Sequence, residues 1–150
     1  MASHANLIIF LRGVPLSYLH TKILMLSSAL FMTVLGLIAT FAPQELLTST
    51  GNGPQVIALL IVQAAGGLYL GFAFLNWMAK DNLIGGVYSR PVAMGNMLHF
   101  FVVAMALLKV AISNQRTPAI TLATVFYAIF TIWFGLVVFT NPLRKTTPAN

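Results

Sequence analysis

Residues 66–101 read GGLYLGFAFLNWMAKDNLIGGVYSRPVAMGNMLHFF, two apolar runs on either side of one short polar loop. This segment contains most of the glycines of the chain, one of its two acids, one of its two tryptophans and a histidine, His99, deep in an apolar run. The rest of the chain is largely hydrocarbon. We therefore expect any functional site to lie in this segment, while the composition of the whole chain determines the class of protein.

The composition places the chain in a membrane. Of its 150 residues, 59% are hydrophobic and only 7% are charged, and the mean hydropathy is +0.90. A water-soluble domain of this length has too little core to bury so much apolar surface, so the lipid bilayer must be the solvent. The chain has no cysteine, which excludes disulfides, thiolate metal sites and cysteine-based redox chemistry.

The hydropathy pattern predicts an all-α integral membrane protein, a single domain over residues 1–150 with four transmembrane helices in an antiparallel bundle. Helices of about 20 residues or more cross a hydrocarbon layer of ~30 Å at ~1.5 Å per residue. Prolines mark the helix ends: Pro43 follows the first helix, and Pro54, Pro91 and Pro118 suit the first turns of the next three. The predicted spans are residues 17–42, 54–79, 91–112 and 117–140.

The segments outside these spans are short. Leu7 to Leu11 is apolar but too short to span a bilayer, and its cation follows the apolar patch, so we expect a short N-terminal interfacial segment and not a cleaved signal peptide. Residues 44–54 are rich in threonine, serine, glycine and asparagine. This composition predicts a polar, turn-rich connection between the first two spans.

The distribution of cations predicts the orientation in the membrane, because Lys and Arg near helix ends favour the cytoplasmic side. One side has Arg12, Lys22, Lys80, Arg90, Arg144 and Lys145, and the other side has Lys109 and Arg116. Both termini should therefore be cytoplasmic, and the loop that contains Glu45 should face outward. No basic stripe is interleaved with aromatic residues, so the net charge of +6 does not indicate a nucleic-acid partner.

Three glycines of the second predicted helix are candidates for close helix packing. Gly67 and Gly71 have the GxxxG spacing, and Gly66 adjoins them. Small residues let helix backbones approach closely in lipid, where dispersion replaces the hydrophobic effect. The contact that we expect at Gly67 and Gly71 could lie within one chain, between copies of the chain, or along a ligand groove.

Asn76, Asn96 and His99 form a descending series of polar groups. Counted inward from the loop at residues 80–90, the two asparagines come to a similar depth, and His99 lies one turn deeper. A buried polar group costs several kcal/mol unless it is paired. The three side chains either satisfy one another as packing residues, with an amide hydrogen bond between the asparagines, or they line one pocket that contacts a polar ligand headgroup.

The mouth of such a pocket would be formed by Trp77, Tyr88 and Arg90. One interpretation is anchoring at the cytoplasmic interface, with a surface ion pair at Asp81. The alternative is an anionic headgroup held by Arg90, Tyr88 and the backbone amides of residues 85–86.

Carboxylates are missing from all four predicted spans, since the two acids, Glu45 and Asp81, fall in loops. A carboxylate proton relay therefore lacks its usual parts, and no serine, histidine and acid can be grouped as a triad. A bis-histidine haem would need a second histidine at the depth of His99, and Met94 and Met97 near it are more typical of gap-filling than of a Cu(I) site. We assign no catalytic residue and no metal ligand, and the cofactor is unknown.

The segment quoted above resembles small uncharacterised bacterial inner-membrane proteins with four helices, of the DoxX-like group. The resemblance rests on four short spans, on the proline that closes the first helix in the sequence FAP and on the glycine-rich second helix, and it covers most of the chain. That group carries no agreed catalytic residues that could be transferred. The resemblance implies the architecture and a bacterial inner membrane.

These observations favour a small non-enzymatic membrane protein. It would act as an accessory subunit of a larger membrane complex or as a binder of lipid or quinone-like apolar ligands. One alternative is a membrane enzyme or transporter subunit whose chemistry needs His99. Another is a homo-oligomeric pore built around the face of Gly67 and Gly71. The expected partners are the lipid bilayer, copies of the chain, or other membrane proteins.

Overall fold

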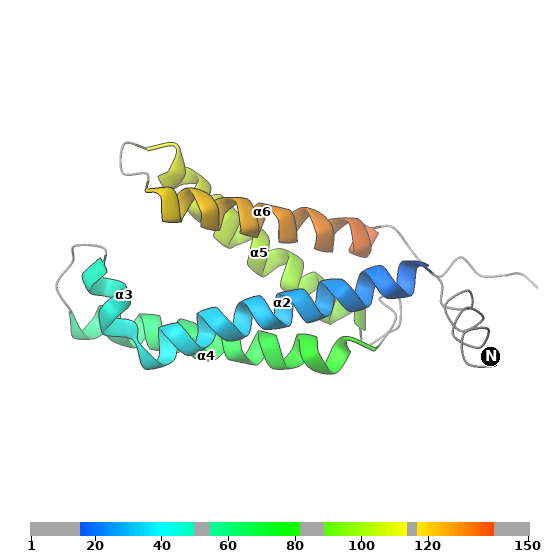
Figure 1. The fold of residues 1–150 in the computed structure, drawn as a ribbon, viewed down its shortest axis with the longest axis horizontal. Helices are drawn as coiled ribbons and strands as arrows, with labels where there is room; N and C mark the ends of the chain where they lie inside the picture. The colour runs from blue at the N-terminus through cyan, green and yellow to red at the C-terminus, as the bar shows by residue number, and fades with distance from the viewer. Residues whose placement is uncertain (1–15, 50–54, 82–88, 114–116, 140–150) are drawn as a thin grey trace, which may run out of the picture. The chain divides into compact units, whose positions relative to one another are not determined.

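The computed structural model describes residues 16–49, 55–81, 89–113 and 117–139, and these ranges are almost entirely helical, with no strand among them. The prediction of an all-α protein with four long apolar helices is confirmed. The elements, shown in Figure 1, are α2 (Leu16–Phe41), α3 (Pro43–Ser49), α4 (Val56–Ala79), α5 (Ser89–Ala111) and α6 (Pro118–Phe139). The predicted interfacial segment, Leu7 to Leu11, lies outside the described residues.

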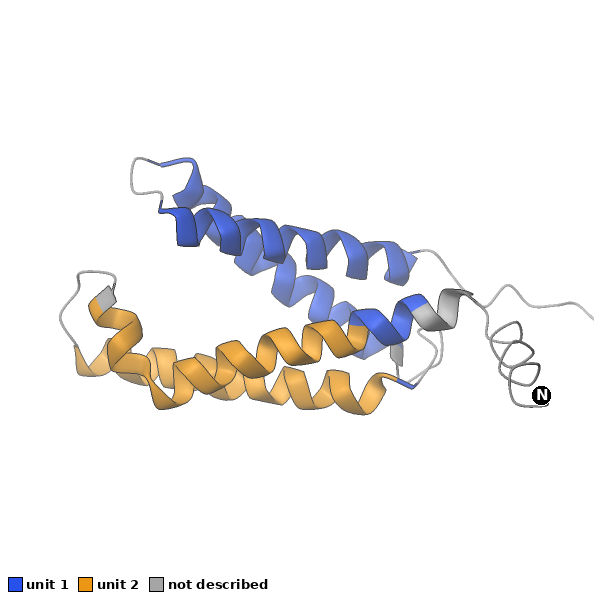
Figure 2. Ribbon diagram, in the orientation of Figure 1, with its two compact units in different colours: residues 1–24, 81–150 blue, residues 25–80 orange. Residues whose placement is uncertain are grey.

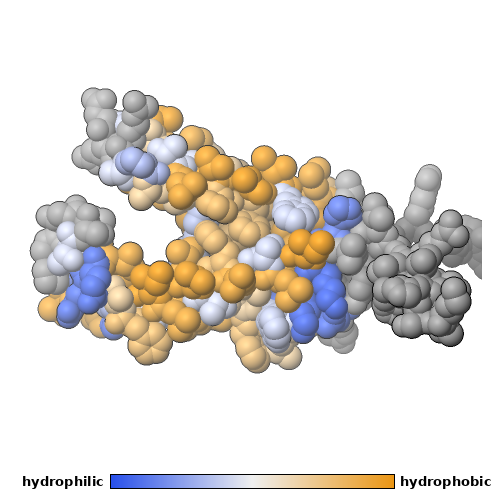
Figure 3. Space-filling model, viewed as in Figure 1, coloured by the Kyte–Doolittle hydropathy of each residue, from blue (hydrophilic) through white to orange (hydrophobic). Residues whose placement is uncertain are grey.

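Four of these helices are long and apolar enough to cross a membrane, over His20–Phe41, Val56–Ala79, Arg90–Ala111 and Pro118–Phe139. Large apolar side chains stand on their surfaces, among them Phe41 at 78% exposure and Phe139 at 74%. Figure 3 shows hydrophobic residues along the helices and hydrophilic residues gathered towards helix ends. Water would not tolerate so much exposed hydrocarbon, but a bilayer solvates it.

Pro91 and Pro118 lie in the first turns of α5 and α6, as predicted, while Pro54 lies outside the described residues. Pro118 is the first residue of α6, whereas α5 begins at Ser89, two residues before Pro91. A proline lacks only an N–H, and the first N–H groups of a helix have no intrahelical acceptor, so a helix can begin just ahead of it. The second span begins at Val56, with Gln55 as its extended N-cap residue.

The connection after the first span corrects one prediction. We expected a turn-rich segment over residues 44–54, but its first half forms the short helix α3, which contacts α4. Pro43 occupies the first position, and Glu45 lies in the first turn, where a negative charge complements the helix dipole. The Thr48 hydroxyl donates to the carbonyls of Gln44 and Glu45 at 3.0 and 3.1 Å. The first half of this stretch is therefore helical and not a turn-rich connection.

The chain divides into two compact units, shown in Figure 2, which we describe separately. Unit 2 comprises residues 25–80, and unit 1 comprises residues 1–24 and 81–150. In unit 2, α2 and α4 pack as an antiparallel pair, because Ser28 faces Asn76 and Thr40 faces Gly66. In unit 1, α5 and α6 pack together. The expectation of one domain over the whole chain stays a prediction.

The α2 and α4 backbones approach most closely at Gly66 and Gly36. A Cβ atom on Gly66 would lie 2.5 Å from Thr40 Oγ1 and 2.8 Å from Thr40 N, and one on Gly36 would lie 2.8 Å from Leu70 Cγ and 3.0 Å from the Gly66 carbonyl oxygen. Real Cβ atoms do not approach other atoms so closely. Glycine is therefore required at Gly66, where two of the three nearest atoms belong to the backbone, whereas a side chain at Gly36 would displace Leu70 and crowd the Gly66 carbonyl oxygen.

Gly67 and Gly71 do not take part in this contact within unit 2. The close contact predicted at these two residues, within one chain, between copies of the chain or along a ligand groove, stays a prediction. A Cβ atom added to either would meet nothing within 4 Å. Consecutive residues lie ~100° apart around a helix, so when Gly66 faces α2, Gly67 turns away from it. The buried face of α4 is formed by Gly66, Ala73, Asn76 and Ala79.

A cluster of aromatic side chains holds α5 against α6 in unit 1. Phe100 is fully buried, and its ring stacks on those of Phe130 and Phe134 with centroid distances of 4.7 and 5.6 Å. Tyr127 adds a tilted contact at 5.5 Å. Offset stacking of this kind contributes about 0.5–1.5 kcal/mol per pair beyond the burial of area. Phe100 is thus the centre of the α5–α6 interface.

Candidate functional site

Asn76 is fixed by a hydrogen bond across the α2–α4 interface. Its side chain is fully buried, and Nδ2 donates to Ser28 Oγ at 3.0 Å and approaches Met32 Sδ at 3.9 Å. Ser28 is also fully buried, and its hydroxyl donates in turn to the Met25 carbonyl oxygen at 3.0 Å. The serine hydroxyl is therefore both acceptor and donor. This relay satisfies two polar side chains that would be costly to leave unpaired in an apolar interior.

We expect Ser28→Ala to destabilise the α2–α4 pair, because Asn76 loses the hydroxyl that accepts its hydrogen bond. Interhelical hydrogen bonds in membrane proteins measure about 0.6 kcal/mol on average and reach ~1.7 kcal/mol in double-mutant cycles. A cycle with Ser28→Ala, Asn76→Ala and the double variant, followed by unfolding in mixed detergent, should give a coupling energy in this range. A coupling of zero would mean that the two residues contribute independently.

Thr40 carries a buried hydroxyl with no hydrogen-bond partner among the residues that the structure describes. The Thr40 carbonyl oxygen accepts a 3.5 Å hydrogen bond from Gln63 Nε2 of α4, but the hydroxyl oxygen packs over Gly66. A buried hydroxyl without a partner is unfavourable, whereas the methyl group of the same side chain packs at no such cost.

Thr40→Val should therefore leave the stability of the protein unchanged or raise it, since valine keeps the shape and removes the hydroxyl. This outcome is the reverse of that expected for Ser28→Ala, although both changes remove one buried hydroxyl. Thermal unfolding of the two variants in the same detergent makes the comparison. A loss of stability in Thr40→Val as large as that in Ser28→Ala would show that the Thr40 hydroxyl is bonded in the membrane.

Asn96 is fixed within its own helix. The side chain is fully buried, and Nδ2 donates to the Val92 carbonyl oxygen at 2.8 Å, one turn earlier in α5. The two asparagines thus have Ser28 and Val92 as hydrogen-bond acceptors. Asn76 belongs to unit 2, and Asn96 and His99 belong to unit 1. An amide bond between the asparagines, and one pocket shared by all three residues, stay predictions.

His99 lies at the edge of the aromatic cluster of unit 1. Its ring meets that of Phe100 edge-on at a centroid distance of 5.5 Å, and that of Tyr127 at 6.3 Å. The imidazole thus lies beside one ring of its own helix and one ring of α6, a setting common for a packing residue. Among the described residues, no three histidine, cysteine or acidic side chains are grouped as a metal site would require.

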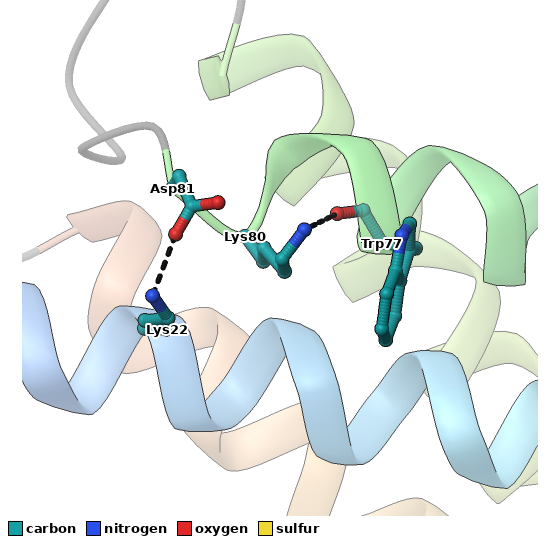
Figure 4. A network of polar contacts seen from close by, with 4 residues as sticks. All are labelled: Lys22, Trp77, Lys80 and Asp81. Carbon is teal, nitrogen blue, oxygen red and sulfur yellow. Dashed lines mark hydrogen bonds and ion pairs between the residues drawn. The ribbon is translucent and has the colours of Figure 1, made fainter.

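The charged groups at the end of α4 are shown in Figure 4. Lys22 Nζ lies 2.7 Å from Asp81 Oδ1, and both side chains are partly exposed, so the predicted surface ion pair at Asp81 is confirmed with Lys22 as the partner. Such a pair contributes at most ~1 kcal/mol in water. Arg90 is exposed at the start of α5, while Tyr88 and residues 85–86 lie outside the described residues.

Trp77 and Lys80 form a second contact in this region. Lys80 Nζ donates to the Trp77 carbonyl oxygen at 3.3 Å and lies 4.4 Å from the centroid of the indole ring, a cation–π geometry (Figure 4). Trp77 is 55% exposed. A tryptophan beside a lysine at a helix end is typical of the membrane–water interface, as expected for Trp77 from the sequence.

Unit 2 also has an apolar groove between α2 and α4, with a volume of about 310 Å³. Its floor is formed by two buried alanines, Ala29 and Ala73, and exposed side chains such as Leu30 and Phe74 form its walls. Small residues face each other where larger ones would have filled the space. The complete lining consists of Leu26, Ala29, Leu30, Thr33, Leu70, Ala73, Phe74 and Trp77.

The groove offers little to a polar ligand along its length. Thr33 is the single lining residue with a hydroxyl, and this hydroxyl donates to the Ala29 carbonyl oxygen at 2.8 Å within its own helix. The interior therefore suits a hydrocarbon chain. Trp77 lines one end of the groove, and Lys80, which contacts Trp77, does not itself line it. From the sequence we predicted Trp77 at the mouth of a pocket formed by Asn76, Asn96 and His99, and we missed the groove. Small residues are frequent in both helices, so Ala29 and Ala73 alone do not reveal it.

The residues predicted as a site are thus distributed over both units. Trp77 lines the groove and Asn76 belongs to the buried relay in unit 2, whereas Asn96 and His99 pack within unit 1. The resemblance to DoxX-like proteins stays a prediction. Comparison of the chain with protein-family models, with curated proteins and with solved structures finds no match.

Proposed function

We propose that this protein is a small non-enzymatic membrane protein that binds a lipid or quinone-like apolar ligand. The observation that supports this function is the groove of unit 2, which is lined mostly by hydrocarbon, floored by Ala29 and Ala73, and bordered at one end by Trp77 with Lys80 beside it. Concave apolar surfaces with a few polar groups at one point are typical of ligand sites. The setting of His99 among aromatic rings supports a packing role over an enzyme or transporter that uses it.

Retention of a ligand through purification tests this function. The protein should be extracted in a gentle detergent, washed with excess detergent, and analysed by native mass spectrometry and by mass spectrometry of a solvent extract. We expect an apolar molecule bound in a defined ratio of ligand to protein. A washed protein that carries neither lipid nor quinone, and that takes up neither when they are added, would contradict the proposed function.

We further propose that the protein resides in a bacterial inner membrane with both termini in the cytoplasm, as the cation asymmetry indicates. The cysteine-free chain permits a direct test with single cysteines at Ser49 and at Ser89. On intact cells an impermeant thiol reagent should label Ser49→Cys and not Ser89→Cys. The opposite pattern would invert the orientation.

A second candidate function, as an accessory subunit or one protomer of a homo-oligomer, is supported by the open face at Gly67 and Gly71. Both glycines are exposed, and no described residue lies within 4 Å of a Cβ atom built on them. Small residues on an exposed transmembrane face allow a second helix to approach closely. Native mass spectrometry of Gly71→Leu should show loss of copies or partner chains that the wild type retains. Leu68→Ala, at an exposed neighbour, serves as the control.

A further inference from the structure

We propose that the groove of unit 2 holds one acyl chain of an anionic phospholipid, and that Lys80 binds its phosphate. The inference rests on the proposed function and identifies the class of ligand and its orientation. The groove lies between two facing stretches of antiparallel helices, from Leu26 opposite Trp77 to Thr33 opposite Leu70. Every contact used below lies within residues 25–80.

The dimensions of the groove fit an acyl chain that enters from the membrane surface. Seven residues of helix separate Leu26 from Thr33, which corresponds to ~10 Å at ~1.5 Å per residue. One leaflet of hydrocarbon is about half of the ~30 Å core, or ~15 Å thick. The length of the groove is therefore comparable to two-thirds of one leaflet, and its inner end, at Thr33 and Leu70, lies near the middle of the spans His20–Phe41 and Val56–Ala79. A ligand that begins at the Trp77 end and extends inward matches this length.

The apolar side chains that line the groove favour a hydrocarbon ligand. Ala29 and Ala73 are 3% and 5% exposed and form the floor, while Leu30 and Phe74 are 69% and 65% exposed and stand on either side. The hydroxyl of Thr33 is already bonded to the Ala29 carbonyl. Each methylene placed against such a surface gains dispersion contacts that a mobile lipid tail lacks. A flexible hydrocarbon chain complements this apolar lining.

The positive charge of Lys80, at the end of the groove nearest the membrane surface, favours an anionic headgroup. Lys80 Nζ is held above the Trp77 ring at 4.4 Å and against the Trp77 carbonyl at 3.3 Å, so the cation is positioned at the mouth of the groove that Trp77 lines. A positive charge at this point attracts a phosphate, whereas an uncharged quinone headgroup gains little from it. A basic residue near the surface contributes about 1 kcal/mol to the binding of anionic lipid. The occupant that complements both parts of the site is an anionic phospholipid.

The test compares two lipids with identical acyl chains, phosphatidylglycerol and phosphatidylcholine, added to the washed full-length protein and measured by native mass spectrometry. Wild type should bind both, with the anionic lipid about fivefold tighter. Lys80→Gln should lose this preference and keep binding to both lipids. Phe74→Ala removes one wall of the groove and should weaken both lipids equally. Both substituted residues lie on the surface or at a helix end, so folding should persist, and circular dichroism checks it.

Matched controls come from the same chain. Lys109→Gln removes a lysine near the end of α5, and Phe101→Ala removes an exposed phenylalanine that does not line the groove. Neither should alter the binding of either lipid. If the preference for phosphatidylglycerol survived in Lys80→Gln, or fell equally in Lys109→Gln, Lys80 would not be the residue that binds the phosphate. Tighter binding of a quinone than of both lipids would overturn the choice of occupant.

The outcomes also separate this inference from the function on which it rests. Lipid binding that is insensitive to Phe74→Ala would place the lipid elsewhere on the protein and overturn the inference, while the proposed function as a lipid binder would stand. If the wild type bound neither phosphatidylglycerol, nor phosphatidylcholine, nor an added quinone, the result would contradict both this inference and the proposed function.

Discussion

Gly66→Leu should abolish the packing of α2 against α4. Even a single methyl group at this position would lie 2.5–2.8 Å from Thr40 and 3.0 Å from the carbonyl carbon of Ala39, and two of these three atoms belong to the backbone, which cannot rotate away. Overpacking in a core costs about 1–3 kcal/mol, and occasionally more. We expect a loss above ~3 kcal/mol, because leucine forces the two backbones apart. The fraction folded during titration with a denaturing detergent measures it.

The adjacent residue provides the control for this experiment. Gly67→Leu adds the same side chain on the same helix, yet nothing lies within 4 Å of the Cβ position. Its effect on stability should be small, because no packed atom is displaced and replacement of glycine in a helix interior favours the helix by up to ~1 kcal/mol. Equal losses in the two variants would mean that the helix faces are assigned wrongly.

Phe100→Ala should be the most destabilising change in unit 1. Phe100 is fully buried and stacks on Phe130 and Phe134 of α6, so alanine leaves a cavity at the centre of the α5–α6 interface. Phenylalanine-to-alanine changes in cores cost about 3–5 kcal/mol. We expect a loss of this size, together with the loss of near-ultraviolet circular dichroism from the packed aromatic rings.

Phe101→Ala is the matched control for Phe100→Ala. Phe101 follows directly in α5 but is 50% exposed on the surface of the helix. Its removal should cost well under 1 kcal/mol, because lipid replaces the lost contacts. If Phe101→Ala proved as damaging as Phe100→Ala, Phe101 would have to pack against protein in the membrane.

The spans of the four long helices were predictable because the bilayer imposes a length and a hydropathy on each of them. The observed ends, such as Pro118 at the start of α6, differ from the predicted ends by two residues or fewer. The helical character of residues 43–49 was missed, since threonine, serine and proline also favour turns, and the sequence pattern does not distinguish a capped short helix from a loop.

The inward-facing sides of the helices were not predictable in the same way. In water the polar residues mark the outer face of a helix, but in lipid both faces are apolar, and the GxxxG spacing suggested the face of Gly67 and Gly71. The contact lies at Gly66, opposite Gly36 and Thr40 of another helix. A lone glycine such as Gly36 within a long helix is a usable signal, because it costs ~1 kcal/mol relative to alanine without a packing reason.

The candidate site was predictable only in part, because its contacts depend on which helix faces meet. Asn76 could be identified as a buried polar residue that needs a partner, but nothing in its own helix points to Ser28. The aromatic cluster had a readable pattern, since Tyr127, Phe130 and Phe134 recur at helical spacing. The groove depends on Ala29 facing Ala73, which requires knowledge of the α2–α4 register.

The hydrogen bond from Asn76 to Ser28 has a consequence for how the protein is made. The acceptor precedes the donor by 48 residues, so Ser28 has already left the ribosome when Asn76 is synthesised. An amide that enters the bilayer alone is penalised, but this one meets its partner as soon as α4 is inserted. Residues 25–80 are continuous in the chain, and their packing contacts at Gly36 and Gly66 are internal to them. This helical hairpin can therefore assemble during synthesis, before α5 emerges.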